Sequence, residues 1–196
     1  SYLMNNIEKN IDWLNDIKNK THVSIEKITF DGMDQWNFDC QKSSINHITG
    51  KFFSVIGIDV SINDEYFKHW SQPIIDQSEI GILGIIAKKI DKEVYFLMQA
   101  KIEPGNINYT QLSPTLQATK SNYTKVHKGK RPPYIEQFED STNKVLIDQL
   151  QSEQGSMFLS KRNRNIIIMV EDDGPGIDEK EYENVFKPFY KIDKSR

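Results

Sequence analysis

Two long apolar runs separated by a short polar segment constrain the fold of this chain most. The first run extends over residues 80–90 and the second over residues 94–102, and the segment between them includes Asp91 and Lys92. Runs this rich in isoleucine, valine and aromatic residues are typical of strands, and a short polar connection is typical of a hairpin. Their near-continuous hydrophobicity indicates burial in a mixed or antiparallel sheet. We therefore expect a domain of the α/β or α+β class around this sheet.

Weaker patterns predict the elements around this hairpin. In residues 5–20 the apolar positions recur at spacings of three and four, which predicts an amphipathic helix. Further strands are expected at residues 23–30, 52–60, 106–112 and 166–170, and ordered structure is expected to resume at residues 145–150 and 157–159. The polar stretch 113–133 contains few apolar residues, so we expect a long functional loop there and no core element.

Composition narrows the class of protein. Among 196 residues, 25 Lys and Arg against 28 Asp and Glu give a net charge of -3, which argues against a broad nucleic-acid-binding surface. The single cysteine, Cys40, excludes an intramolecular disulfide and is expected to be a free thiol. No apolar run reaches the roughly 18 residues of a membrane span, and the first twenty residues do not resemble a signal peptide. These features predict a soluble, cytoplasmic protein that does not enter a membrane.

A lysine and a glutamate form the first candidate site. If residues 94–102 are a strand, Gln99, Lys101 and Glu103 share one face of it. An ordinary ion pair explains this spacing, and so does an active site in which a cation and a general base tune each other.

The second candidate site lies in the polar stretch. Residues 121–127 include Tyr123 and His127, and Arg131 follows soon after. Histidine transfers protons near neutral pH, tyrosine donates to an oxyanion, and arginine binds a diphosphate in a bidentate manner. A solvated basic loop explains the same residues about as well. The four histidines lack the paired spacing of a metal site, and there is no P-loop, dinucleotide fingerprint or nucleophile elbow, so we expect no metal.

Several longer strings of the sequence resemble one enzyme family. They include residues 44–57 (SINHITGKFFSVIG), 96–138 (beginning FLMQAKIEPGNINYTQL) and 148–165 (DQLQSEQGSMFLSKRNRN). These strings are similar to the NDP-hexose 2,3-dehydratases, over about residues 1–165.

The resemblance implies a function and a fold. Family members take a dTDP-linked 4-keto-6-deoxyhexose and remove its 2-hydroxyl as water, in deoxysugar biosynthesis and without a cofactor. They are homodimers whose subunits contain two Nudix-like domains, so we expect one Nudix-like mixed sheet with flanking helices here, in a single copy. The alternative is a remnant that binds a nucleotide sugar without turning it over.

The resemblance also places site residues. We expect Glu103 or His127 to be the base, and Tyr123 or Lys101 to stabilise the enolate. Arg131 or Arg162 is expected to bind the diphosphate, and the remaining polar partners are Asn106, Gln111, Gln117 and Asn122.

The last thirty residues resemble a different family. A D-x-G-x-G box at Asp172, Gly174 and Gly176, followed by an F-x-P-F segment at residues 186–189, is similar to the ATP-binding domain of sensor histidine kinases. We therefore expect a dehydratase-like domain over residues 1–165 and a kinase-like strand–turn–helix fragment over residues 166–196. The sequence shows neither the magnesium-binding asparagine helix nor a second glycine box, so the fragment is not expected to act as a kinase. A kinase-derived nucleotide-binding or signalling fusion is the alternative function that this fragment favours.

Overall fold

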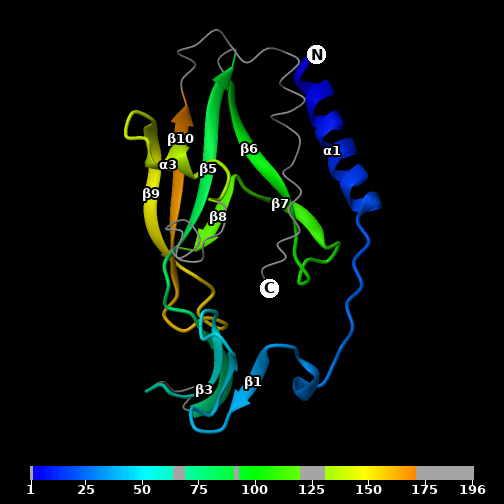
Figure 1. The fold of residues 1–196 in the computed structure, drawn as a ribbon. Coiled ribbons are helices and arrows are strands. Elements are labelled where there is room, and N and C mark those ends of the chain that lie inside the picture. The colour runs from blue at the N-terminus through cyan, green and yellow to red at the C-terminus, as the bar shows by residue number, and fades with distance from the viewer. Residues whose placement is uncertain (1, 64–68, 91–92, 120–130, 171–196) are drawn as a thin grey trace.

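The computed structural model describes residues 2–63, 69–90, 93–119 and 131–170, which form a mixed α+β structure made mostly of strands in two open sheets (Figure 1). In chain order the elements are α1 (Tyr2–Lys20), the 3-10 turn η1 (Phe30–Gly32), β1 (Trp36–Asp39), β2 (Ser44–His47), β3 (Ser54–Ser61), β4 (His69–Asp76), β5 (Gly81–Ile90), β6 (Glu93–Ile102), β7 (Thr110–Pro114), β8 (Leu116–Thr119), α3 (Ile135–Glu139), β9 (Lys144–Ser152) and β10 (Arg162–Val170). None of the helices in these residues is long and apolar enough to cross a membrane.

The larger sheet contains the hairpin that dominates the sequence. Its strand order is β7-β6-β5-β10-β9, and β8 also pairs with β5. β5 and β6 run antiparallel, with Ile86 opposite Leu97, which confirms the predicted hairpin. β10 runs parallel to β5 and antiparallel to β9, so the sheet is mixed.

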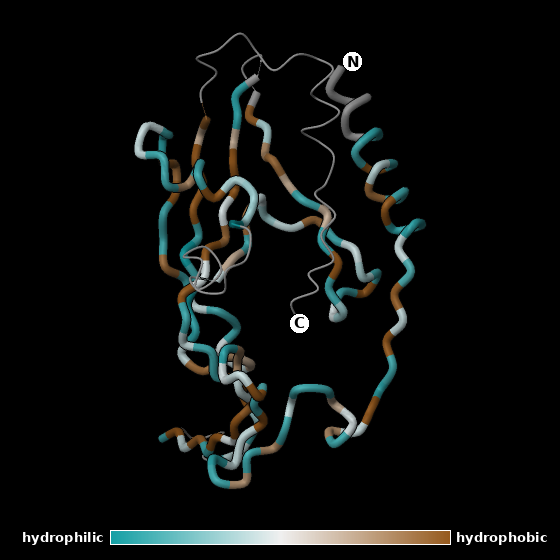
Figure 2. Tube along the Cα trace, in the orientation of Figure 1, coloured by the Kyte–Doolittle hydropathy of each residue, from teal (hydrophilic) through white to brown (hydrophobic). Residues whose placement is uncertain are grey.

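One face of this sheet carries the hydrophobic core. The short helix α3 packs there through Ile135, which is 1% exposed. The other buried members come from the central strands: Ile82, Ile86, Leu116, Ala118, Ile166 and Ile168. Figure 2 shows the corresponding apolar stretches along β5 and β10.

A glycine in β5 allows α3 to approach the sheet. A Cβ placed on Gly84 would lie 2.5 Å from two ring atoms of Phe138, a residue of α3 that packs against the core. Ordinary contacts between carbon atoms are about 3.5–4.0 Å. The missing side chain of Gly84 therefore makes room for the aromatic ring.

Several predicted elements differ from those observed. Residues 113–119, expected in a loop, form the end of β7 and all of β8, and Leu116 is 2% exposed in the core. The alternation of Leu116 and Ala118 with polar neighbours gives β8 one buried face, although its composition is polar. The expected strand at 106–112 begins at Thr110, because residues 103–109 form a hydrogen-bonded turn.

The strand expected at residues 23–30 is absent from the structure. Residues 21–29 have no strand assignment, and η1 follows them. Ile25 and Ile28 are half exposed or more, so their apolar spacing does not mark a buried strand face.

Strand β10 continues across the expected domain boundary. The boundary after Asn165 lies inside this strand, whose register with β5 is continuous from Asn163 to Val170. The pairing with β9 also crosses the boundary, with a register shift between Ile167 and Ile168. Residues 171–196, which contain the expected kinase-like box and helix, lie outside the described residues.

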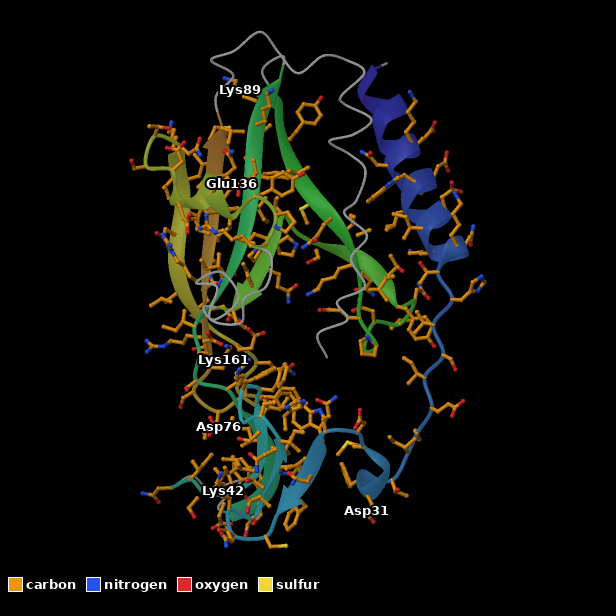
Figure 3. All side chains as sticks on the ribbon, in the orientation of Figure 1. Asp31, Lys42, Asp76, Lys89, Glu136 and Lys161 are labelled. Carbon is orange, nitrogen blue, oxygen red and sulfur yellow. The ribbon has the colours of Figure 1, made fainter. Side chains whose placement is uncertain are left out.

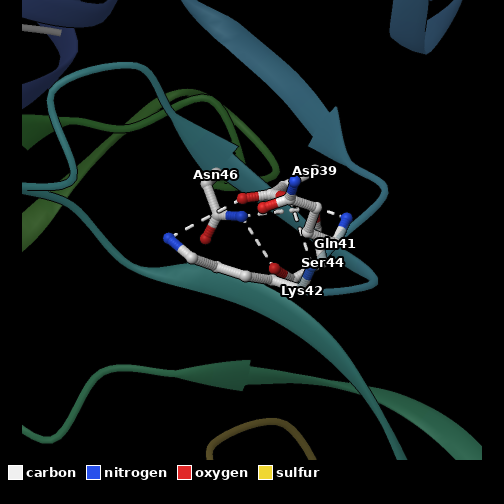
Figure 4. Close-up of polar contacts among 5 residues, drawn as sticks. All are labelled: Asp39, Gln41, Lys42, Ser44 and Asn46. Atoms are coloured by element: carbon white, nitrogen blue, oxygen red, sulfur yellow. Dashed lines mark hydrogen bonds and ion pairs between the residues drawn. The ribbon is translucent and has the colours of Figure 1, made fainter.

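The smaller sheet has the order β1-β2-β3-β4, and all its pairs are antiparallel. Asp39 ends β1 and organises the turn into β2: its Oδ1 accepts the backbone N–H groups of Gln41 at 2.9 Å and Lys42 at 3.1 Å (Figure 4). The hydrogen bond from the Lys42 backbone is the main reason that the pKa of Asp39 is lowered. Past the turn, Asn46 donates to the Ser44 hydroxyl at 2.7 Å.

The two sheets meet at the connection between β9 and β10. Ile75 of β4 donates its N–H to the Met157 carbonyl and accepts the N–H of Leu159, both at 2.9 Å. Lys161 lies at this junction (Figure 3); it is 5% exposed, and its Nζ donates to the backbone carbonyl of Glu79. Burial lowers the pKa of Lys161, while the Glu79 and Glu153 carboxylates oppose that shift.

Candidate functional site

The larger sheet divides where β7 continues into β8, a region we call the fork. β7 pairs with β6, from Met98 to Ile102, whereas β8 pairs with β5, from Gly81 to Gly84. Only Thr115 separates the two short strands. β7 and β8 are therefore one bent strand that crosses from β6 to β5, and β5 and β6 diverge on either side of it.

The fork contains an open pocket of about 240 Å³. Its walls come from β5, β6, the turn after β6, and both arms of the bent strand. The lining residues are Leu83, Lys101, Glu103, Asn106, Gln111, Leu112, Ser113, Pro114 and Gln117. Five of these are residues that the sequence analysis assigned to the site: Lys101, Glu103, Asn106, Gln111 and Gln117.

Lys101 connects the two sides of the pocket. Its Nζ lies 2.8 Å from Glu103 Oε1 and donates to Gln117 Oε1 at 2.7 Å. The Ser113 hydroxyl donates to the same Gln117 oxygen at 3.2 Å. An ammonium group has three N–H donors. Within the described residues Glu103 and Gln117 engage two of them, so the third is available to a ligand. The arrangement presents a cation and a carboxylate side by side in the pocket.

A tight turn fixes Glu103 at the end of β6. Its backbone N–H donates to the Tyr109 carbonyl at 2.9 Å, and its carbonyl accepts the Asn106 N–H at 3.1 Å. The Asn106 side chain closes the turn by donating to the Tyr109 carbonyl at 3.1 Å. Tyr109 has a φ of 57°, in the left-handed region, which reverses the chain into β7. Glu103 therefore projects from a defined backbone position.

The remaining predicted site residues lie elsewhere. Both Nη2–Oε distances between Arg131 and Glu139 are 2.5 Å, so this guanidinium is engaged at α3 and does not line the pocket. Arg162 is exposed at the start of β10, opposite Ser152, and does not line it either. Asn122, Tyr123 and His127 lie outside the described residues.

A second cavity, of about 260 Å³, lies at the small sheet and contains none of the predicted site residues. It is lined by Gly50, Lys51, Phe52, Asp76, Gln77, Ser78 and Glu79. The ring of Phe52 also contacts His47 at a centroid distance of 4.4 Å, within an aromatic group that includes Trp36 and Phe53.

Metal-ligating side chains do not gather in the described part of the chain: no three His, Cys, Asp or Glu residues there are placed to hold an ion. Cys40 is a free thiol, as the sequence predicts, and the structure shows that it is exposed.

Sequence reasoning missed Ser113 and Thr115. Both are buried, at 8% and 5% exposure, and both are placed by the bend of the strand. Both alternate with the apolar residues Leu112, Pro114 and Leu116, so the sequence pattern puts them on the polar face and gives no signal of their burial.

Comparison with known proteins identifies the family. The model of the family described as NDP-hexose 2,3-dehydratase matches residues 7–183, a range that also includes Asp172–Gly176. A dTDP-4-dehydro-6-deoxy-alpha-D-glucopyranose 2,3-dehydratase from Saccharopolyspora spinosa is 47% identical over 164 residues, or 83% of this chain and 34% of that protein. Proteins of the same name from Amycolatopsis orientalis and Streptomyces violaceoruber are 44% and 47% identical, covering 83% and 69% of this chain and 36% and 31% of their own lengths.

The chain spans about a third of the length of the curated relatives that it matches. The family match nevertheless covers most of the chain, including both arms of the fork. The chain therefore belongs to the NDP-hexose 2,3-dehydratase family.

Proposed function

We propose that the fork pocket binds the hexose of a dTDP-linked 4-keto-6-deoxy sugar and takes part in removing its 2-hydroxyl as water. The observation that carries this proposal is the Lys101–Glu103 pair at 2.8 Å in a pocket lined by side-chain amides. The names of the relatives, which describe 2,3-dehydratases of a dTDP-4-dehydro sugar, support the choice of substrate and reaction.

The size and charge of the pocket favour the sugar over the nucleotide. Sites for drug-sized ligands measure about 300–1,000 Å³, whereas this pocket measures about 240 Å³. Its two charged groups, Lys101 and Glu103, cancel, and no arginine lines it. Asn106, Gln111 and Gln117 offer both hydrogen-bond donors and acceptors, which suits neutral hydroxyl and keto groups.

The reaction needs a base beside a hydrogen-bond donor. The 4-keto group acidifies the C3 proton, Glu103 accepts that proton, and electron density moves onto the keto oxygen. The Lys101 ammonium stabilises that developing oxyanion through its third N–H. The C2–O bond then breaks, the leaving hydroxyl takes a proton and departs as water, and the resulting enol tautomerises to the 3,4-diketo-2,6-dideoxy sugar. His127 and Tyr123 stay candidate acids or bases for the same steps.

Three further features belong to this proposal: the fold, the homodimer and the binding of the diphosphate. The mixed sheet with α1 and α3 supports one copy of a Nudix-like fold. We also propose that the chain works as a homodimer in the cytoplasm. Binding of the diphosphate by Arg131 requires its pair with Glu139 to open. The kinase-like interpretation of residues 166–196 stays a separate hypothesis, and binding of ATP is its test.

Turnover of the dTDP-4-keto-6-deoxyglucose substrate tests the proposal. The chain is expected to give a product lighter by one water in mass spectrometry, and Glu103→Gln is expected to lower that rate by about 10²–10⁴-fold, as loss of a general base does. Glu136→Gln, on the exposed side of α3, makes the same change of charge away from the pocket and is expected to leave the rate unchanged. Equal rates in the wild type and Glu103→Gln would contradict the assignment of the base.

A further inference from the structure

We propose that Thr115 is a positioning residue whose hydroxyl sets the width of the fork and thereby places the two walls of the Lys101 pocket. This inference rests on the proposed function, because it assigns to Thr115 the geometry of that same site. Thr115 does not line the pocket, so it acts through the residues on either side of the fork.

The Thr115 hydroxyl lies between the two strands at the point where they separate. It accepts the backbone N–H of Ile86 in β5 at 3.0 Å and donates to the backbone carbonyl of Leu97 in β6. Ile86 and Leu97 face each other in the last register pair of β5 and β6 before the fork. One hydroxyl thus connects the two diverging strands at their branching point.

The chemistry of this position requires a hydroxyl. A threonine hydroxyl donates one hydrogen bond and accepts others, so it serves a carbonyl and an N–H at the same time. Thr115 is 5% exposed and Ile86 is 6% exposed, so water does not readily replace these bonds. Valine at this position has nearly the same shape but leaves a buried N–H and a buried carbonyl without partners.

The pocket depends on the distance between the two arms of the fork. The hydrogen bond from Lys101 to Gln117 runs from β6 to β8, across the fork. A second bond, from the Gln99 side chain to the Pro114 carbonyl at 2.9 Å, holds the end of β7 against β6. Gln117 lies two residues after Thr115 in the bent strand. If the branching point relaxes, Gln117 moves relative to Lys101, and the ammonium loses the partner that orients it beside Glu103.

The chain offers a matched control in Thr110. It is 0% exposed at the start of β7, and its hydroxyl is the buried side-chain polar atom that has no hydrogen-bond partner within the described residues. Thr110→Val therefore removes a buried hydroxyl of the same kind without removing a bond.

The experiment compares Thr115→Val, Thr115→Ser and Thr110→Val at a temperature where circular dichroism shows each variant folded. Three quantities are measured: hydrogen exchange of the Ile86 amide, NMR signals of the Gln117 side-chain amide, and the Kd for dTDP-4-keto-6-deoxyglucose. In Thr115→Val we expect at least tenfold faster exchange, shifted Gln117 signals and at least tenfold weaker binding, because one unsatisfied buried group already corresponds to a ratio of about ten and this variant leaves two. Thr115→Ser and Thr110→Val are expected to behave as the wild type.

The outcomes separate a positioning role from a structural one. Faster Ile86 exchange with unchanged Gln117 signals and unchanged Kd would overturn the proposal, because the hydroxyl would then stabilise the fold alone. A wild type that does not bind the dTDP-sugar would contradict the proposed function, and the Gln117 signals would still decide the role of Thr115. If Thr115→Val does not fold, Thr115→Cys replaces it. A thiol is a weak hydrogen-bond donor, so its exchange rate, Gln117 signals and Kd are expected to lie between those of the wild type and those of a variant without the hydrogen bonds. Measurements equal to those of Thr115→Ser would overturn the proposal.

Discussion

Replacing Gly84 by alanine tests how α3 packs on the sheet that carries the fork. The new Cβ would meet two ring atoms of Phe138 at 2.5 Å, and a third at 3.1 Å. Since carbon contacts are normally about 3.5–4.0 Å, the ring has to move by about 1 Å within the packed core. Overpacking of this kind costs about 1–3 kcal/mol.

The backbone effect of the substitution has the opposite sign. Alanine in a strand is favoured over glycine by about 0.5–1 kcal/mol. The net loss for Gly84→Ala is therefore between about 0 and 2.5 kcal/mol, with a middle value of about 1 kcal/mol, measured as the free energy of unfolding in urea. For a chain of 196 residues, that middle value corresponds to a Tm lowered by about 2–4 °C.

Gly57→Ala is the matched control. Gly57 lies in β3, its φ is not in the left-handed region, and a Cβ there meets nothing within 4 Å. This variant is expected to be as stable as the wild type or more stable by up to about 1 kcal/mol. A second test is Phe138→Leu in the Gly84→Ala background, which removes the clash, so the two substitutions together should cost less than the sum of their separate effects. Equal stabilities for Gly84→Ala and Gly57→Ala would refute the packing described here.

Three further predictions concern the core and the charges. Leu116→Ala is expected to lower the free energy of unfolding by about 2–5 kcal/mol because Leu116 is 2% exposed in the core. An effect below about 0.5 kcal/mol in urea unfolding would mean that residues 116–119 form a loop, as the sequence analysis expected, and not β8. Burial lowers the pKa of Lys161, so the unfolded chain binds more protons than the folded one between that lowered pKa and the ordinary 10.5. The free energy of unfolding should therefore rise with pH through this window. In Lys161→Met, thermal unfolding should no longer show that rise, and a pH profile equal to that of the wild type would argue against the burial of Lys161. Hydrogen bonding from Arg164 lowers the pKa of Asp148, so the stability that this pair contributes should be present above pH 3.8 and disappear as the pH falls through the lowered pKa. If Asp148→Asn loses stability in acid just as the wild type does, the pair does not cause that loss.

Strong local patterns made the central sheet predictable. The β5–β6 hairpin has two near-continuous apolar runs and a short polar connection, and the structure has both strands within a residue of their expected limits. The grouping of Lys101 with Glu103 was also predictable, because strand geometry alone puts residues 101 and 103 on one face.

The fork was not predictable because it depends on long-range pairing. β8 has only four residues, and nothing in its sequence shows that it leaves β6 for β5. In the small sheet, β3 matches the strand expected at residues 52–60, whereas β1, β2 and β4 were not expected. The strand expected at residues 23–30 was wrong, because an apolar spacing of two indicates a strand only where another strand is present to pair with it. The roles of Arg131 and Arg162 came from residue type, whereas the structure places these two side chains away from the pocket.

The central claim is that the fork pocket holds the hexose of a dTDP-linked 4-keto sugar. The most direct measurement follows the side-chain amide signals of Asn106, Gln111 and Gln117 by NMR while dTDP-4-keto-6-deoxyglucose is added, with dTDP alone as the comparison. The account predicts that the complete substrate shifts these three pairs of signals saturably and that dTDP alone, which lacks the sugar, leaves them nearly unchanged. Saturable binding that shifts signals elsewhere and leaves these three unmoved would contradict the claim.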